Sequence, residues 1–258
     1  MTSELVVMLP FVFLLGITVG SFLNVCIYRI PLNEDIVREH SHCMRCGYRL
    51  RWYDLIPVIS WVMLGGKCRS CKEKISVQYP VIELANGVLW TLTVLRFGFC
   101  FTSLWYAGSI SALIVLSLID WRTYEIPFSC NLWILAMGVG NLITECMAGG
   151  LSRAPEFLTG AFLVSGFLEL LILLTKGRAM GGGDVKLMFA AGLLLGWKGI
   201  LWAFLTGCIA GSIIHPILMK WKNKSRVLAF GPYLSLGIWI SMMWGRQMTE
   251  WYMGYLLR

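Results

Sequence analysis

Long apolar runs recur from one end of the chain to the other, and they limit its fold more than any other feature. A helix needs about 20 apolar residues to cross the roughly 30 Å hydrocarbon layer of a bilayer. The sequence predicts about eight such spans, at 5–28, 81–97, 101–119, 128–147, 157–174, 185–195, 200–219 and 230–244. The sixth is short, so we expect it to be tilted, broken or partly re-entrant.

The composition supports a membrane protein. Of the 258 residues, 57% are hydrophobic and 14% are charged, whereas soluble domains carry about 25% charged residues. The first run follows Glu4 rather than a basic segment, and no small-residue cleavage site precedes Arg29. We therefore interpret it as a mature helix rather than a signal peptide. The predicted fold class is an all-α polytopic membrane protein.

The basic residues predict the orientation. With the N-terminus outside, 17 of the 22 Lys and Arg residues fall in loops on one side of the membrane and 5 on the other. Cytoplasmic loops collect Lys and Arg, so the first side is predicted to be cytoplasmic. Contact with anionic membrane lipids accounts for the net charge of +8, and no nucleic-acid partner is expected.

One polar segment of appreciable length interrupts the apolar pattern, at 30–80. The predicted domains are a first transmembrane helix at 1–29, a small cytoplasmic insert at 30–80 and a helical bundle at 81–258. An insert of roughly 50 residues is too small for a robust apolar core. We therefore expect a covalent or metal staple within it.

Two C-x-x-C pairs supply such a staple. Cys43 and Cys46 form the first pair and Cys68 and Cys71 the second, with 21 residues between them, one more than is usual in zinc ribbons. Four thiolates close the tetrahedral shell of a structural Zn²⁺ ion. The alternative is disulfide bonding, which is rare in the reducing cytosol. The pattern favours a structural zinc site.

Two of the four aspartates, Asp120 and Asp184, lie at the edges of predicted spans and on the same cytoplasmic face. An ionisable residue at membrane depth indicates function. Two carboxyl groups about 3 Å apart cannot both be ionised, so such a pair shares a proton. One would then activate water as a base while the other polarises a carbonyl group.

Each aspartate also has a structural interpretation. Asp120 would be a helix-end acid paired with Arg122 or a neighbouring lysine, and Asp184 would cap a helix N-terminus and complement its dipole. The glycines at 181–183 allow a backbone to approach Asp184 closely. This Gly-rich turn lacks the Lys-Ser/Thr ending of a phosphate-binding loop.

An ordered set of motifs extends the interpretation over nearly the whole chain. Besides the two cysteine pairs, they are GSFLNVCIYRIP at 20–31, WYDLIPVISW at 52–61, YPVIE at 79–83, Asp120 with the Ile-Pro at 126–127, MGGGDVKL at 180–187 and FGPYLSLG at 230–237. In these motifs the chain resembles the bacterial type IV prepilin peptidases, which are membrane aspartyl proteases of the GxGD type.

The resemblance implies that Asp120 and Asp184 are the catalytic pair. It implies a site that faces the cytoplasm at the bacterial inner membrane, where the basic leader of type IV prepilins or pseudopilins is cut after a glycine. It also implies that the insert binds zinc. Many family members further methylate the new N-terminus with S-adenosylmethionine, which no pattern in this sequence indicates independently. The chain departs from the family at Phe128, where Asp or Asn is frequent, and at Ala229, where Pro is frequent.

Five further residues are expected to contact substrate or support the aspartates: Gly181, Gly183, Lys186, Glu83 and Asn24. For Glu83 a structural ion pair is an equally good interpretation. Lys186 either tunes Asp184 or extends towards lipid headgroups.

Glu169 lies within the apolar run FLELLI at 167–172. An unpaired charge at membrane depth is costly. We therefore expect Lys176 or Arg178 to pair with it in a structural role.

Other functions remain open at the level of sequence. The chain would instead be a non-enzymatic transporter or scaffold if the acids bind ions and the zinc module docks a partner. Broken helices near the middle of the bilayer would favour that alternative. In a third interpretation the insert is itself a methyltransferase module that binds S-adenosylmethionine.

Overall fold

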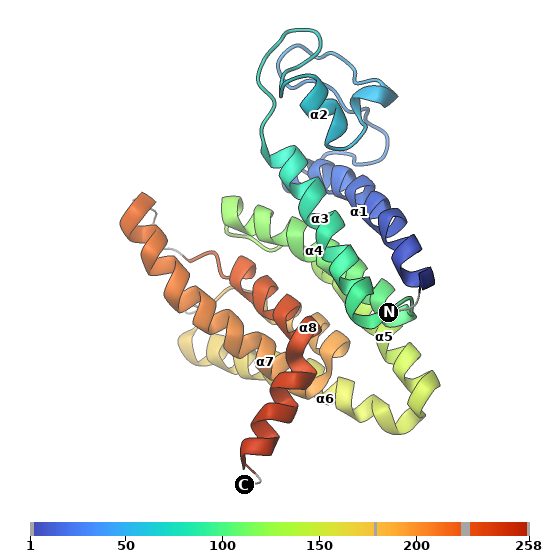
Figure 1. Cartoon of the computed structure of the whole chain (residues 1–258). Helices are drawn as coiled ribbons and strands as arrows, with labels where there is room; N and C mark the ends of the chain where they lie inside the picture. Colours follow the sequence, from blue (N-terminus) through green and yellow to red (C-terminus); the bar gives the residue numbers. More distant parts are fainter. Residues whose placement is uncertain (1–2, 178–179, 223–227, 257–258) are drawn as a thin grey trace. The chain divides into compact units, whose positions relative to one another are not determined.

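The chain folds into helices, most of them joined by short connections, with one long and largely irregular insert between α1 and α3. The computed structural model describes residues 3–177, 180–222 and 228–256, and this part of the chain contains no strand (Figure 1). The helices are α1 (Ser3–Arg29), α2 (Ile59–Met63), α3 (Gln78–Phe97), α4 (Phe101–Thr123), α5 (Phe128–Gly149), α6 (Ala154–Thr175), α7 (Gly182–Lys222) and α8 (Gly231–Leu256). The all-helical prediction is confirmed.

Within the described residues, five helical segments are long and apolar enough to cross a membrane. They are Val6–Leu32, Phe101–Thr123, Phe128–Gly149, Leu151–Thr175 and Gly182–Lys220. The predicted spans at 81–97 and 230–244 coincide with α3 and α8, which are not in this group. The count of eight spans therefore stays a prediction.

Helix α7 contains two predicted spans, at 185–195 and 200–219. At 41 residues a straight helix would be about 60 Å long, twice the thickness of the hydrocarbon layer. The helix is not straight, because Gly196 has φ 71° and ψ 176°, which are not helical angles. Glycine reaches a positive φ without the steric penalty of a Cβ atom. Gly196 thus divides α7 close to the predicted boundary.

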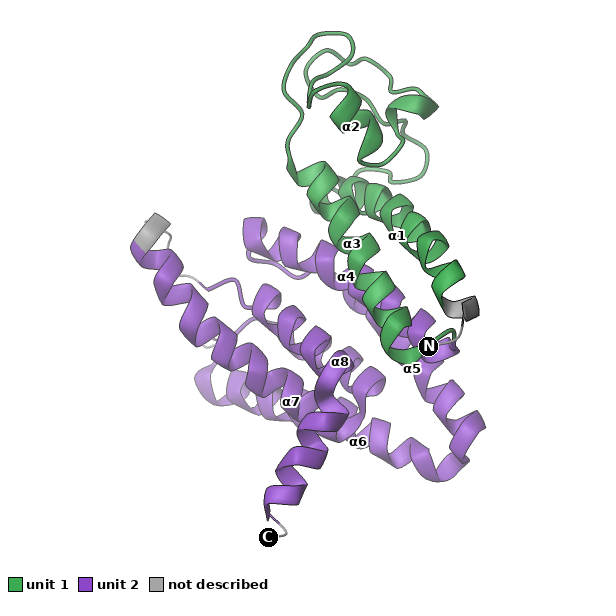
Figure 2. Ribbon diagram, in the orientation of Figure 1, with its two compact units in different colours: residues 1–99 green, residues 100–258 purple. Residues whose placement is uncertain are grey.

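The chain forms two compact units, 1–99 and 100–258 (Figure 2). In the first unit α1 packs along α3, and the polar insert with α2 lies between these two helices in the sequence. A Cβ atom on Gly16 would lie 2.7 Å from the Cα of Gly87, so the helices meet at small residues. Asn86 Nδ2 donates to the carbonyl of Gly16 at 2.7 Å. The predicted three-part domain division stays a prediction.

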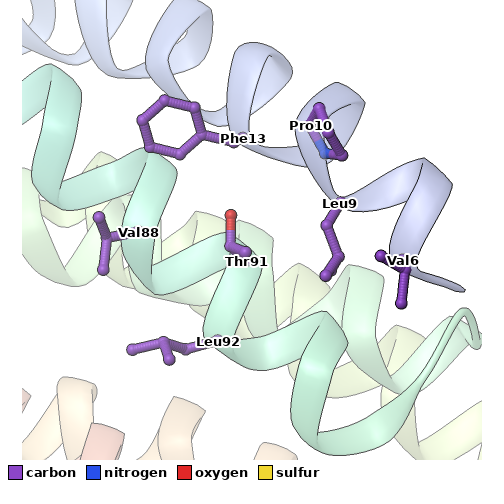
Figure 3. Close-up of a pocket in the computed structure, with 7 residues that line it drawn as sticks. All are labelled: Val6, Leu9, Pro10, Phe13, Val88, Thr91 and Leu92. Atoms are coloured by element: carbon purple, nitrogen blue, oxygen red, sulfur yellow. The ribbon is translucent and has the colours of Figure 1, made fainter. Parts of the chain in front are cut away.

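An apolar hollow lies between α1 and α3 (Figure 3). Leu9, Pro10 and Phe13 line it from α1, and Val88 and Leu92 face them from α3. The hydroxyl group of Thr91, also in its wall, donates to the carbonyl of Gly87 at 2.8 Å. The wall of the hollow is therefore apolar, and the hollow is suited to binding hydrocarbon rather than to catalysing a reaction.

In the second unit, α7 is the central helix and packs against α5, α6 and α8. Helices α6 and α7 meet at glycines: a Cβ atom on Gly160 would lie 2.5 Å from the carbonyl carbon of Gly196 and 2.7 Å from the oxygen of Gly192. Asn141 of α5 donates to the carbonyl of Leu194 in α7 at 2.9 Å. Small residues and buried amides thus fix α7 against its neighbours, as is usual where the surroundings are apolar.

Candidate active site and metal centre

Asp120 lies in the last turn of α4 and is 4% exposed. Its Oδ2 accepts a hydrogen bond of 2.8 Å from the backbone N–H of Gly231, the first residue of α8. A Cβ atom on Gly231 would lie 2.7 Å from the same oxygen. The observed partner is thus a backbone N–H at a helix N-terminus, a position that favours negative charge.

Asp184 lies in the first turn of α7 and is 8% exposed. Its Oδ1 has no hydrogen-bond partner among the described residues. An N-cap acid would accept N–H groups two or three positions later, whereas Asp184 is already the third residue of α7. The geometry therefore does not support a simple capping role.

The two carboxyl groups belong to the same unit and are close enough to interact electrostatically. Two further buried polar atoms, near the starts of α5 and α8, have no partner in the described part of the chain. They are Oδ1 of Asn131, in the first turn of α5, and the hydroxyl group of Tyr233, in the first turn of α8. Buried polar atoms are nearly always paired in a protein. These atoms therefore mark places where a ligand group or water can bind.

The glycines before Asp184 have different surroundings. A Cβ atom on Gly183 would lie 2.9 Å from the Cβ of Ile126, in the connection that follows α4. The carbonyl of Gly183 also accepts from Asn131 Nδ2 at 3.4 Å. At Gly181 the nearest atom to a Cβ would be Oδ2 of Asp184, at 4.0 Å. Gly183 thus brings the start of α7 against the end of α4, while Gly181 leaves space beside the carboxyl group.

Lys186 is directed towards an aromatic ring rather than a carboxylate. Its Nζ lies 5.5 Å from the ring centroid of Phe128, the first residue of α5. This is the range of a cation–π contact. Lys186 therefore contacts Phe128, one of the two positions at which the sequence motifs depart from the family pattern.

Glu83 and Asn24 lie in the first unit, and their observed partners are there too. Glu83 is buried in α3, and its Oε2 accepts from the N–H of Val58 at 2.7 Å. Val58 has φ 62°, which is unfavourable for a β-branched residue. Asn24 Nδ2 donates to the carbonyl of Tyr79 at 3.2 Å, between α1 and α3. Glu83 thus holds a turn of the insert, and Asn24 joins two helices.

The four cysteines of the insert converge. Their Sγ atoms all lie within 4.8 Å of one another, and those of Cys43 and Cys71 are 3.9 Å apart. A disulfide requires about 2.05 Å. Four ligands at the Zn–S distance of 2.3 Å would form a tetrahedron with edges of about 3.8 Å. The donor set therefore fits a closed zinc site. The predicted convergence of the four cysteines is confirmed.

Both cysteine pairs use the same turn. Gly47 and Lys72 follow the second cysteine of each pair with φ of 70° and 59°, and their N–H groups donate to the carbonyls of Cys43 and Cys68. Backbone N–H groups of Cys46 and then Arg45 hold the pKa of the Cys43 thiol at about 6, below its ordinary value. At Cys71 the N–H of Glu73 also lowers the thiol pKa, but desolvation and the three neighbouring thiols outweigh it and raise the pKa to about 11. The turn thus favours the thiolate that a metal requires at Cys43.

Comparison with known proteins identifies the chain. The bacterial peptidase A24 N-terminal domain matches residues 14–97, and the type IV leader peptidase family matches residues 107–215. A "Prepilin leader peptidase/N-methyltransferase" of Pseudomonas aeruginosa is 32% identical, over 94% of this chain and 92% of its own length. This chain belongs to the type IV leader peptidase family. A protein of the same name from Aeromonas salmonicida is 30% identical over 95% of this chain and 94% of its own length. Comparison with solved structures gave no match.

Membership of the type IV leader peptidase family indicates that this protein is a peptidase. The five apolar segments agree with an integral membrane protein. A peptidase family also favours the enzymatic hypothesis over the transporter or scaffold. The resemblance found in the sequence motifs is confirmed.

Several residues of the candidate site and of the insert were not expected from sequence. Gly231 lies in the motif FGPYLSLG, which carried the resemblance without an assigned role. Asn131 is one of two amides in the apolar helix α5, and that was its only signal. Asp54, in the motif WYDLIPVISW, is the clearest omission in the insert.

Asp54 joins the two halves of the metal centre. Its side chain is 2% exposed, and Oδ1 accepts from Nε of Arg69, between Cys68 and Cys71, at 2.8 Å. Oδ2 accepts from the N–H of Arg51 at 3.2 Å, on the segment that leaves the first cysteine pair. A buried carboxylate with such partners orients both metal-binding turns.

Proposed function

We propose that this protein is a multi-pass aspartyl endopeptidase of the bacterial inner membrane. It removes the basic leader from type IV prepilins or pseudopilins by cleavage after a glycine, on the cytoplasmic side. The observation that carries the chemistry is the pair of buried, interacting carboxyl groups of Asp120 and Asp184 on separate helices. The names of the relatives support the substrate class.

The reaction begins with water between the two carboxyl groups, which together hold one proton. Asp120, whose Oδ2 accepts the Gly231 N–H, acts as the carboxylate that takes a proton from water as its oxygen bonds to the scissile carbonyl carbon. Asp184, with a free Oδ1, carries the shared proton and donates it to the carbonyl oxygen. A tetrahedral diol results.

Collapse of the diol completes hydrolysis. Asp120 returns its proton to the amide nitrogen, the C–N bond breaks, and Asp184 recovers a proton from a diol hydroxyl group. The products are a leader with a new carboxyl group and a protein with a new amine. The carboxyl pair regains its single proton, so one water molecule is consumed for each bond.

The zinc ion of the insert has a structural role in this proposal. Zinc bound by Cys43, Cys46, Cys68 and Cys71 would close a small domain that cannot build an apolar core of its own. Four protein thiolates leave no open position for substrate. The chemistry is therefore assigned to the aspartates alone.

The orientation of the protein is also proposed, from the 17 basic residues on one predicted side. Asp120 at the end of α4 and Asp184 at the start of α7 share this side. Accessibility of single cysteines to a membrane-impermeant reagent in oriented vesicles tests it. Labelling of the insert from the periplasmic face would contradict the orientation.

A second activity, N-methylation of the new amine with S-adenosylmethionine, is proposed from the names of the relatives. It needs no residue assignment to be tested. Transfer of a labelled methyl group to the N-terminus of the cleaved product would support it. If the substrate is fully cleaved but its new N-terminus carries no methyl group, the proposed methyltransferase activity is wrong.

The peptidase proposal is tested with isosteric variants and a prepilin that carries a basic leader. We expect Asp120→Asn and Asp184→Asn each to lower the rate of leader removal by at least about 100-fold, the contribution of a general acid or base. Asp35→Asn is the control, because Asp35 is an exposed acid of the insert whose side chain accepts from the N–H groups of Val37 and Arg38 and pairs with the Arg38 side chain. If both site variants process the substrate as fast as this control, the mechanism is wrong.

A further inference from the structure

A groove opens on the second unit between α5, α6 and α7, with a volume of about 400 Å³. Its wall is largely apolar, formed by side chains that include Leu132 and Leu135 of α5, Phe162 of α6 and Phe189 of α7. Phe162 and Phe189 pack edge to face, with ring centroids 5.3 Å apart. This end of the groove suits a hydrocarbon or apolar peptide surface.

Two glycines of α6 show what kind of surface the groove accepts. At Gly160 the packing of this unit requires glycine, because a Cβ atom there would clash with α7. Gly166 lines the groove, and a Cβ atom there would have no atom of the described chain within 4 Å. A glycine inside a helix destabilises that helix relative to alanine. At helix–helix interfaces in membranes, glycine lets another backbone approach closely.

The other end of the groove is polar and lies beside the candidate active site. Val185 and Lys186, which directly follow Asp184, form part of its wall, and so does Asn131, whose amide holds the carbonyl of Gly183. Glu169 lies six residues before the end of α6, and Asp184 is two residues after the start of α7. Both are thus within about two turns of the same end of this helix pair.

Glu169 is an exposed carboxylate in an otherwise apolar helix. Within the described residues it forms no ion pair, so the expected pairing with Lys176 is not observed, and Arg178 lies outside those residues. The first four N–H groups of any helix have no partner within it, and its N-terminus attracts negative charge. A carboxylate at the polar end of an apolar groove is therefore complementary to the start of an apolar helix.

We propose that this groove binds the part of the substrate that follows the cleaved bond, and that this part is an apolar helix. Its N-terminal turn lies against Glu169, and its apolar side packs on Gly166 and the phenylalanines. The inference rests on the proposed function, because it takes the scissile bond to lie at Asp184. The groove then binds the apolar segment while the aspartates act on the bond that precedes this segment.

Kinetics with two substrates test the groove. One is a full-length prepilin, and the other is a short peptide with the leader and only a few residues beyond the cleaved bond. We expect Gly166→Phe to lower kcat/KM for the prepilin at least tenfold, through KM, and to change it less than twofold for the short peptide. Glu169→Gln should lower kcat/KM for the prepilin about fivefold, the scale of a helix-dipole contact. Leu163→Phe is the control, since Leu163 is exposed on α6 and is not part of the groove wall.

Photocrosslinking gives a readout that does not depend on cleavage. A photoreactive residue in place of Leu132, in the Asp184→Asn variant, should crosslink to the apolar segment of the prepilin, and one in place of Leu163 should not. Crosslinks only to lipid or to a second copy of this chain, or equal kinetics for Gly166→Phe and Leu163→Phe, would overturn the proposal. Loss of cleavage in the parent enzyme with crosslinking intact would instead count against the proposed function.

Discussion

The contact between Asp120 and the start of α8 leads to a sharp prediction for Gly231→Ala. A Cβ atom on residue 231 would lie 2.7 Å from Oδ2 of Asp120 and 3.1 Å from both its Cγ and Cδ2 of Leu116. Ordinary contacts begin near 3.4 Å, so the carboxylate must move by about 0.7 Å. Gly231 is not among the glycines with positive φ, so the effect of alanine is steric.

The size of the effect follows from the hydrogen bond that is lost. Moving Oδ2 away weakens its 2.8 Å bond to the N–H of residue 231. A hydrogen bond to a charged group contributes about 1.5–3 kcal/mol, and a tenfold change in rate corresponds to about 1.36 kcal/mol. We therefore expect kcat/KM to fall by about 10- to 150-fold. Because Asp120 acts on the water, the change should appear in kcat and leave KM nearly unchanged.

The assay is the initial rate of leader removal from a prepilin by purified enzyme in lipid, over a range of substrate concentrations. Gly254→Ala is the matched control on the same helix, since a Cβ atom there meets nothing within 4 Å. Thermal unfolding of both variants separates activity from stability. If Gly231→Ala is folded and within twofold of Gly254→Ala in kcat, then α8 does not position Asp120 and our reasoning is wrong.

Four further predictions concern the insert and the residues around the site. Removal of zinc by a strong chelator should expose the segment 30–80 to proteolysis, because the metal replaces an apolar core; unchanged protection would contradict a structural metal. Asp54→Ala should raise the zinc dissociation constant at least about tenfold in chelator competition, whereas Glu73→Gln, at an exposed ion pair, should change it less than twofold. Glu83→Leu should lower the thermal midpoint, because the N–H of Val58 loses its acceptor at a cost of about 1–3 kcal/mol; an unchanged midpoint would refute this. Phe128→Leu should change KM by no more than about fivefold, the scale of a cation–π contact.

The sequence was sufficient where the determining interactions are local. Apolar runs predict helices because each span buries its own backbone hydrogen bonds. The metal cluster follows from cysteines three positions apart, whose turns are nearly the same in both pairs. These features depend on short stretches of chain, so spacing alone reveals them.

Contacts between distant residues could not be found in the same way. The bond between Asp120 and Gly231 joins positions 111 residues apart, and nothing in the periodicity of either helix indicates it. The break in α7 at Gly196 was only approximated, as a boundary between two spans. Asp54 was passed over because an acid in a polar insert resembles a solvated residue, while its burial against Arg69 is a property of the folded domain.

The ends of α4 and α7 give the proposed site a location that suits hydrolysis. Water must reach the scissile bond, and it is scarce at the centre of a bilayer. Asp120 and Asp184 are almost fully buried, yet each lies within one turn of a helix end. In the proposed mechanism this burial allows the two carboxyl groups to share a proton, while the helix ends keep the pair close to solvent. Oδ1 of Asp184, which has no partner among the described residues, is then available to the water molecule or to the peptide group.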